Sequence, residues 1–241
     1  MTPELFAAAA DVCRDFAPPR GYGLVYGSQA ACDGKSRSDL DLVIIGRSRP
    51  GFQPMSELVA AVCGLHRDFG LTSDTEVDYE TKLFATYADV CCAVELRCFP
   101  RREGNPSPEP VVADPDWLNS AEFAQRLVLN ALTSQHVFLG GDVQRYRGDR
   151  SRAERAVASL ALSLVDKPEV SLQEAVAALT QSPAGARGKD FLGYQPNAHL
   201  CSTIQSGFAA LAACNMVEAV GGARFRRCRR PRGVVGPVQA A

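Results

Sequence analysis

The fold of this chain is decided by the stretch 27-GSQAACDGKSRSDLDLVIIG-46. The run from Leu40 to Ile45 is apolar and rich in β-branched residues, is interrupted only by Asp41, and is closed by Gly46. This pattern is typical of a strand that is buried on both faces. The residues Tyr22–Tyr26 directly before Gly27 predict another strand. We therefore expect a strand, a Gly-Ser turn, a short crossover, and a second strand that carries two acids.

The two acids, Asp39 and Asp41, are spaced so that a strand would direct both carboxylates to the same side. Two negative charges this close are unfavourable unless a cation lies between them, and a hard divalent cation such as Mg²⁺ prefers oxygen ligands. Gly27 permits a close backbone approach, and Ser28 offers a hydroxyl and an N–H. The pattern thus predicts a site for a metal ion and a phosphate.

Gly-Ser, a spacer and Asp-x-Asp, each at a strand end, resemble the signature of the DNA polymerase β-like nucleotidyltransferase superfamily. The spacer here is Gln29 to Ser38, and the resemblance covers roughly the first hundred residues. It implies an α/β (α+β) fold, with a nucleotidyltransferase-type mixed sheet and helices, followed by a helical lobe. The sequence departs from the family pattern at Ala31 and Asp33, where small or basic residues are commoner. Because Asp33 would weaken contact with a triphosphate, Lys35 and Arg37 would have to compensate.

The resemblance also implies the roles of residues. Two Mg²⁺ ions and a nucleoside triphosphate are the expected cofactor and co-substrate. The metal ligands would be Asp39, Asp41 and Glu76, and the catalytic set would add Asp78. The nucleotide would be bound by Gly27, Ser28, Lys35, Arg37, Ser38 and Lys189.

The third carboxylate of the site is left open by the sequence. Alternation in an extended segment from Thr72 to Phe84 would place Glu76, Asp78, Glu80 and Lys82 on one face. The superfamily takes its third acid from this neighbouring strand, and either Glu76 or Asp78 fits. A solvated edge strand is the alternative. Lys82 would either neutralise a phosphate oxygen or pair with Glu80.

The rest of the chain predicts a catalytic domain over residues 1–110, a helical domain over 111–222 and a basic, disordered tail over 223–241. A capping residue, Thr2, precedes the first expected helix. His66 is expected to be half-buried and structural. We expect a further strand at Ala93–Phe99, and helices at Pro3–Phe16, Met55–Phe69, Trp117–Val137, Ser151–Val165, Ser171–Leu179 and Ala198–Val220.

Two C-terminal features suggest binding roles, each with a plainer alternative. The loop Gly185–Pro196 holds Lys189 and Tyr194, which either contact the triphosphate or acceptor or belong to an ordinary interhelical loop. The segment Arg224–Arg232 carries six arginines and either binds an anionic partner or is a solvated terminus.

Composition narrows the class of protein. The 241 residues carry a net charge of -1, which gives no general attraction to nucleic acid. No apolar run is long enough to span a membrane and no export signal is visible, so we expect a cytoplasmic protein without membrane partners. The nine cysteines lack metal-binding spacing and are expected to be reduced core thiols.

The resemblance to the nucleotidyltransferase superfamily implies transfer of a nucleoside monophosphate from an NTP to a hydroxyl of a small molecule, with release of pyrophosphate. A long helical lobe resembles the aminoglycoside- and lincosamide-type enzymes of antibiotic modification or biosynthesis. The alternatives are an AMP-adding or antitoxin-like protein that acts on a protein partner, and a binding module that has lost catalysis. The oligomeric state cannot be read from the sequence.

Overall fold

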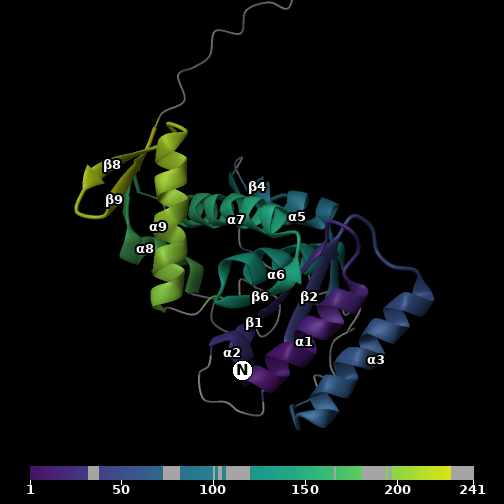
Figure 1. Ribbon diagram of the computed structural model, residues 1–241. Coiled ribbons are helices and arrows are strands. Elements are labelled where there is room, and N and C mark those ends of the chain that lie inside the picture. The colour runs from purple at the N-terminus through teal and green to yellow at the C-terminus, as the bar shows by residue number, and fades with distance from the viewer. Residues whose placement is uncertain are drawn as a thin grey trace, which may run out of the picture.

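The protein is built around a four-stranded sheet in the order β3-β2-β1-β6 (Figure 1). The computed structural model describes residues 1–31, 38–72, 82–99, 101–102, 105–106, 120–165, 167–180, 194 and 197–228. The strand β1 (Tyr22–Tyr26) is antiparallel to both β2 (Asp41–Gly46) and β6 (His136–Gly141), whereas β3 (Phe84–Thr86) is parallel to β2. This mixed sheet with its helices confirms the predicted mixed α and β class.

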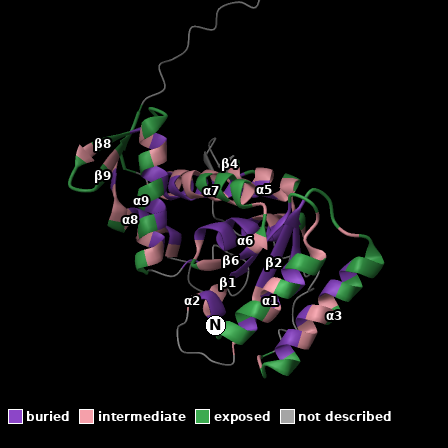
Figure 2. Ribbon diagram, viewed as in Figure 1, coloured by how far each residue is buried: buried purple, intermediate pink, exposed green. Residues whose placement is uncertain are grey.

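The sheet separates two apolar cores. Val25, Leu42 and Ile44 pack with α1 (Pro3–Phe16) and α3 (Phe52–Asp68) on one face. The alternate residues Leu24, Val43 and Ile45 face the opposite core. That core is completed by α5 (Tyr87–Val94), α6 (Ala121–Thr133), α7 (Val143–Leu164), α8 (Leu172–Thr180) and α9 (Ala198–Ala213). The central strands are buried on both faces, which the sequence predicted for the run Leu40–Ile45 (Figure 2).

Local signals for helix starts are confirmed. The hydroxyl of Thr2 accepts a hydrogen bond from the Leu5 N–H, and Pro3 opens α1. Ser171 and Glu174 form a capping box at α8, with the Ser171 N–H donating to Glu174 Oε2 at 2.9 Å and the Glu174 N–H donating to Ser171 Oγ at 3.2 Å. No helix in the described part of the chain is both long and apolar enough to cross a bilayer.

The prediction of one helix from Trp117 to Val137 is wrong at its C-terminal end. The helix α6 stops at Thr133, and β6 then pairs with β1. The strand can end tightly against β1 because Gly141 has a φ of 102° and a Cβ there would lie 2.2 Å from the Gly21 carbonyl oxygen. The predicted domain boundary near residue 110 falls outside the described residues and stays a prediction, but β6 brings the chain beyond it back to the first sheet.

The predicted strand Ala93–Phe99 is also wrong. Its first residues complete α5, and a turn follows at residues 95–98. A capping box fixes the start of α5, because Asp89 accepts from the Thr86 N–H at 2.8 Å while the Asp89 N–H donates to Thr86 Oγ1 at 3.1 Å. Leu96 has a positive φ of 57°, which is incompatible with a continuing strand.

The C-terminal half contains strands as well as the predicted helices. The predicted helix Ala198–Val220 ends at Ala213, and β8 (Val217–Gly221) follows. Arg224–Arg227, predicted to be disordered, instead form β9, which pairs with β8 and with β7 (Glu169–Ser171). Arg226 donates to Glu169 Oε1, and the Phe225 ring lies 4.2 Å from that of Phe208 between centroids. These contacts explain why an arginine-rich segment is ordered. Two short strands, β4 (Arg101–Arg102) and β5 (Asn105–Pro106), and α2 (Gly27–Ala31) complete the described elements.

The packing of α9 on α7 yields a stability prediction. Replacing Gly207 with alanine should lower the free energy of unfolding, because the new Cβ would lie 2.2 Å from the Glu154 carbonyl oxygen and 2.7 Å from Ala158 Cβ. We expect a loss of about 2 kcal/mol in urea unfolding. The control is Gly148→Ala in α7, whose Cβ would meet nothing within 4 Å, and which should gain up to about 1 kcal/mol. Equal stabilities of the two variants would contradict this packing.

Candidate functional site

The Gly-Ser turn and Asp41 meet because of strand register. β1 ends at Tyr26, whose partner across the antiparallel ladder is Asp41, the first residue of β2. Gly27 follows with a φ of 71°, and a Cβ on it would lie 2.3 Å from Asp41 Oδ2. Only glycine fits this position without displacing the carboxylate, which is therefore held directly against the turn.

Asp39 and Ser38 lie in the connection that leads into β2. The strand begins at Asp41, so the expectation that one strand carries both acids does not hold for Asp39, which is half-buried just before it. The Gln29 side-chain amide donates to both the carbonyl and the hydroxyl oxygen of Ser38, each at 2.9 Å. The connection is thereby tied to α2, next to Gly27 and Ser28.

His66 supports the same connection from α3. Its side chain is 4% exposed, and its Nε2 accepts a hydrogen bond of 3.1 Å from the Leu40 N–H. The prediction of a structural role for His66 is consistent with this contact, although the side chain is more deeply buried than expected. The imidazole fixes the backbone directly between Asp39 and Asp41.

Lys82 brings a positive charge to this end of the sheet. Phe84 of β3 pairs with Ile44 of β2, and Lys82 lies two residues before this pairing begins. Residues 82–83 are helical rather than part of an extended segment. Lys82 Nζ lies 3.9 Å from Asp41 Oδ1, and the side chains are 16% and 20% exposed, respectively. Lys82 thus forms an ion pair with the acid of the predicted metal site.

The other predicted residues are only partly tested by the structure. Lys35, Arg37, Glu76, Asp78, Glu80 and Lys189 lie outside the described residues. Tyr194 is 7% exposed, and its hydroxyl shares a hydrogen bond of 2.6 Å with Thr133 Oγ1. Tyr194 therefore belongs to the core rather than to a surface that contacts a ligand.

The donor chemistry of this end of the sheet suits a hard cation. Asp39 and Asp41 offer carboxylate oxygens, which Mg²⁺ prefers. Within the described residues no three His, Cys, Asp or Glu side chains lie close enough together to hold a metal ion. A complete site would need a further ligand, and the predicted candidates Glu76 and Asp78 are outside the described ranges.

Sequence reasoning missed His136, the first residue of β6. It lies opposite Tyr26, which lies opposite Asp41, so these three residues form a row across the sheet. His136 Nδ1 donates to the Ser134 carbonyl at 2.7 Å, and Nε2 accepts from the Tyr146 hydroxyl at 2.7 Å. Burial lowers the pKa of His136 to about 4. Gly140-Gly141 after an apolar triplet was the available signal for this strand, but the helical pattern before it obscured the change.

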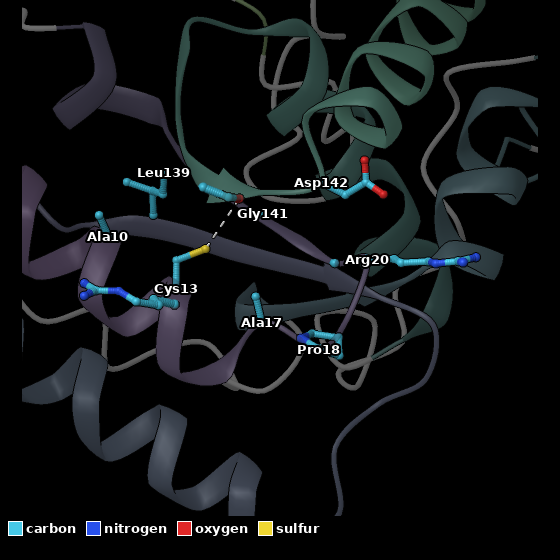
Figure 3. Close-up of a pocket in the computed structure, with 11 residues that line it drawn as sticks. Ala10, Cys13, Ala17, Pro18, Arg20, Leu139, Gly141 and Asp142 are labelled. Carbon is cyan, nitrogen blue, oxygen red and sulfur yellow. Dashed lines mark hydrogen bonds between the residues drawn. The ribbon is translucent and has the colours of Figure 1, made fainter.

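A cavity of about 560 Å³ lies at the opposite end of β1, between α1 and the end of β6 (Figure 3). It is lined by small and apolar residues such as Ala10, Cys13 and Leu139, and also by the charged residues Arg14, Arg20 and Asp142. Burial raises the pKa of the Cys13 thiol to about 11, and its sulfur lies 3.8 Å from the Gly140 carbonyl oxygen. This thiol stays protonated at neutral pH, and the cavity is not part of the Gly27 site.

The cysteines follow the prediction only in part. The described cysteines are free, and Cys13 and Cys98 are buried as core thiols. Cys214 and Cys228 are exposed instead.

Comparisons with known proteins do not assign this chain to a family. No family model matches the sequence, and neither curated proteins nor solved structures give a significant match.

The fit of Gly27 against Asp41 can be measured. Gly27→Ala should destabilise the fold both through its φ of 71° and through the 2.3 Å approach to Asp41 Oδ2. The control is Gly70→Ala, with a φ of 62° and nothing within 4 Å of the new Cβ, which should cost only about 1–2 kcal/mol. We expect Gly27→Ala to cost at least about 1 kcal/mol more in chemical unfolding. The excess should disappear in the Asp41→Ala background, and equal losses in the two single variants would contradict the contact.

The lowered pKa of the half-buried His136 predicts a pH dependence of stability. Its folded pKa of about 4 lies below the ordinary value of 6.5, so the folded state binds fewer protons than the unfolded state between these two values. Stability is then complete above pH 6.5 and falls as the pH drops towards 4. At pH 5 the loss from this residue should be about 2 kcal/mol. Urea unfolding at pH 7 and pH 5 measures this loss. The difference in unfolding free energy between the two pH values should be smaller in His136→Gln than in the unaltered protein. An equal difference in the two proteins would rule out His136 as its source.

Proposed function

We propose that the chain is a Mg²⁺-dependent nucleotidyltransferase that moves a nucleoside monophosphate from an NTP to a hydroxyl of a small-molecule acceptor. The observation that carries the proposal is the Asp41 carboxylate held against the Gly27 turn at the end of the paired strands β1 and β2, with Asp39 two residues before it. A phosphate-binding turn beside a pair of acids is the arrangement that this reaction needs.

The acids have the role of metal ligands. Asp39 and Asp41 would hold Mg²⁺ together with Glu76 or Asp78, and their oxygen donors fit this ion. Bound Mg²⁺ would ease deprotonation of the acceptor hydroxyl and neutralise charge on the departing pyrophosphate. The close packing of Gly27 on Asp41 limits the movement of this carboxylate, which favours a fixed ligand position.

The turn and its neighbours have the role of binding the triphosphate. Gly27 has no side chain to hold a phosphate away from the turn, and Ser28 can donate from its hydroxyl and its N–H. Gln29 holds Ser38 beside the turn and so orients the connection on which Asp39 lies. Lys35, Arg37 and Lys189 are the further cations proposed for the nucleotide.

The residues of the chain would raise the rate of transfer by positioning the triphosphate and the acceptor. In-line attack of an acceptor oxygen on the α-phosphorus needs the triphosphate and the acceptor held in a fixed relation. The paired ends of β1 and β2 supply a rigid platform for the triphosphate, because both strands are buried on each face. The helices α6, α7 and α9 lie on the same side of the sheet as Asp41 and Tyr26 and offer surfaces for the acceptor.

The test is a mass-spectrometric screen of NTPs with pools of hydroxylated small molecules and with protein extracts, read as a nucleoside-monophosphate adduct. Asp41→Asn and Asp39→Asn should each reduce turnover at least about a hundredfold, because loss of one metal ligand costs a few kcal/mol of barrier. The matched control is Asp68→Asn, an exposed acid beside Arg67 at the end of α3, which should keep full turnover. Turnover of Asp41→Asn within about threefold of the unaltered protein would overturn the proposal.

The third carboxylate is tested in the same assay. Glu76→Gln should cost at least about a hundredfold in turnover at saturating Mg²⁺, Asp78→Asn less, and Glu80→Gln least. Glu80 is two strand steps from Glu76, roughly 13 Å in an extended chain, so the two cannot bind one ion. An active Glu76→Gln with an inactive Asp78→Asn would assign the ligand to Asp78 instead.

A further inference from the structure

We propose that Lys82 couples nucleotide binding to metal binding by exchanging partners. In the free protein its ammonium group neutralises Asp41, and on nucleotide binding it moves to the triphosphate and releases the carboxylate for Mg²⁺. This inference rests on the proposed function and adds an order of binding to it. The metal binds weakly to the free protein and tightly once the nucleotide is present.

The ion pair between Lys82 and Asp41 restrains the carboxylate but can separate. Lys82 Nζ and Asp41 Oδ1 are 3.9 Å apart, which is longer than a hydrogen bond. Their side chains are only 16% and 20% exposed, so water screens the attraction less than at an open surface. The pair therefore lowers the cost of burying Asp41, yet no close hydrogen bond between these two atoms has to break when they separate.

An ammonium group and a divalent cation compete for the same carboxylate. Two like charges about 4 Å apart repel each other, and a doubly charged ion is repelled more strongly than a singly charged one. Lys82 at its observed position therefore opposes metal binding at Asp41. Removing this charge from Asp41 is needed before a metal can bind there tightly.

The triphosphate-binding turn offers Lys82 its second partner. The other oxygen of the same carboxylate, Oδ2, faces Gly27, so Lys82 and the Gly27–Ser28 turn flank one side chain. A phosphate bound at the turn would lie beside Asp41. The flexible four-carbon stem of lysine can carry a compact charge over such a distance. By linkage, nucleotide and metal would then each raise the affinity of the other.

The experiment measures Mn²⁺ binding by electron paramagnetic resonance in the full chain without nucleotide. Lys82→Met should bind Mn²⁺ at least about fivefold more tightly, because the competing charge is gone, and Lys82→Gln serves as a second neutral variant. Lys82→Arg keeps the charge and should bind as weakly as the unaltered protein. The matched control is Lys167→Met, which removes a lysine from an ion pair with Glu174 away from this site and should change nothing.

The second measurement is calorimetric binding of a non-hydrolysable NTP analogue in the presence of EDTA. Lys82→Met should weaken it at least about threefold, because a phosphate contact is lost. Unchanged or weaker Mn²⁺ binding in both Lys82→Met and Lys82→Gln would contradict the competition between Lys82 and the metal for Asp41. Unchanged nucleotide binding in Lys82→Met would contradict the movement of Lys82 to the triphosphate.

Asp41→Asn separates this inference from the proposed function. If Asp41→Asn abolishes Mn²⁺ binding while Lys82 variants have no effect, the metal site stands and the exchange fails. If Asp41→Asn leaves Mn²⁺ binding unchanged, the metal assignment of Asp41 fails and the exchange fails with it.

Discussion

The antiparallel register of β1 and β2 is the constraint on which the rest of the site depends. It pairs Tyr26 with Asp41, so the turn that leaves β1 must pass directly over a carboxylate at the start of β2. A side chain on Gly27 would meet Asp41 Oδ2 at 2.3 Å, and the positive φ needed for the turn also favours glycine. One residue thus satisfies a backbone requirement and a packing requirement together. The surrounding strands, buried on both faces, keep this register from slipping.

The long-range contacts of the C-terminal half reinforce the same frame. β6 adds a strand to β1, and Tyr22 of β1 donates a hydrogen bond of 3.2 Å to the buried carboxylate of Asp149 in α7. Burial raises the pKa of Asp149, and Arg152 lies 3.5 Å from its other oxygen. These polar links cross from the sheet to the helices inside an apolar core, where leaving a partner unpaired would be costly. The helices are therefore fixed to the strand that leads into the Gly27 turn.

Structural features that depend on neighbouring residues in the sequence were predictable, and features that depend on residues far along the chain were not. The buried strand at Leu40–Ile45, the cap at Thr2 and the capping box at Ser171 are local and are confirmed. β6 and β9 were missed because a short apolar or arginine-rich run becomes a strand only when a partner strand accepts it. The pairing of Lys82 with Asp41 depends on parallel register between β2 and β3, which no spacing in the sequence reveals. The strand Ala93–Phe99 failed for another reason, because the capping box at Thr86 outweighed its β-prone residues.

Asp41, Tyr26 and His136 lie in a row at one end of the sheet. The polar groups at the two ends of this row, Asp41 and His136, are held by different interactions. At His136 both ring nitrogens are occupied, and Arg150 extends the chain by donating to Tyr146 at 3.4 Å and to Glu154 at 3.0 Å. Such a fully connected network resists change, because each bond lost would leave a half-buried group unpaired. At Asp41 the pairing with Lys82 is longer and purely electrostatic. Because a nearby cation stabilises a partly buried carboxylate, the longer pairing makes Asp41 the member of the row whose cation can be replaced while the rest of the row stays in place.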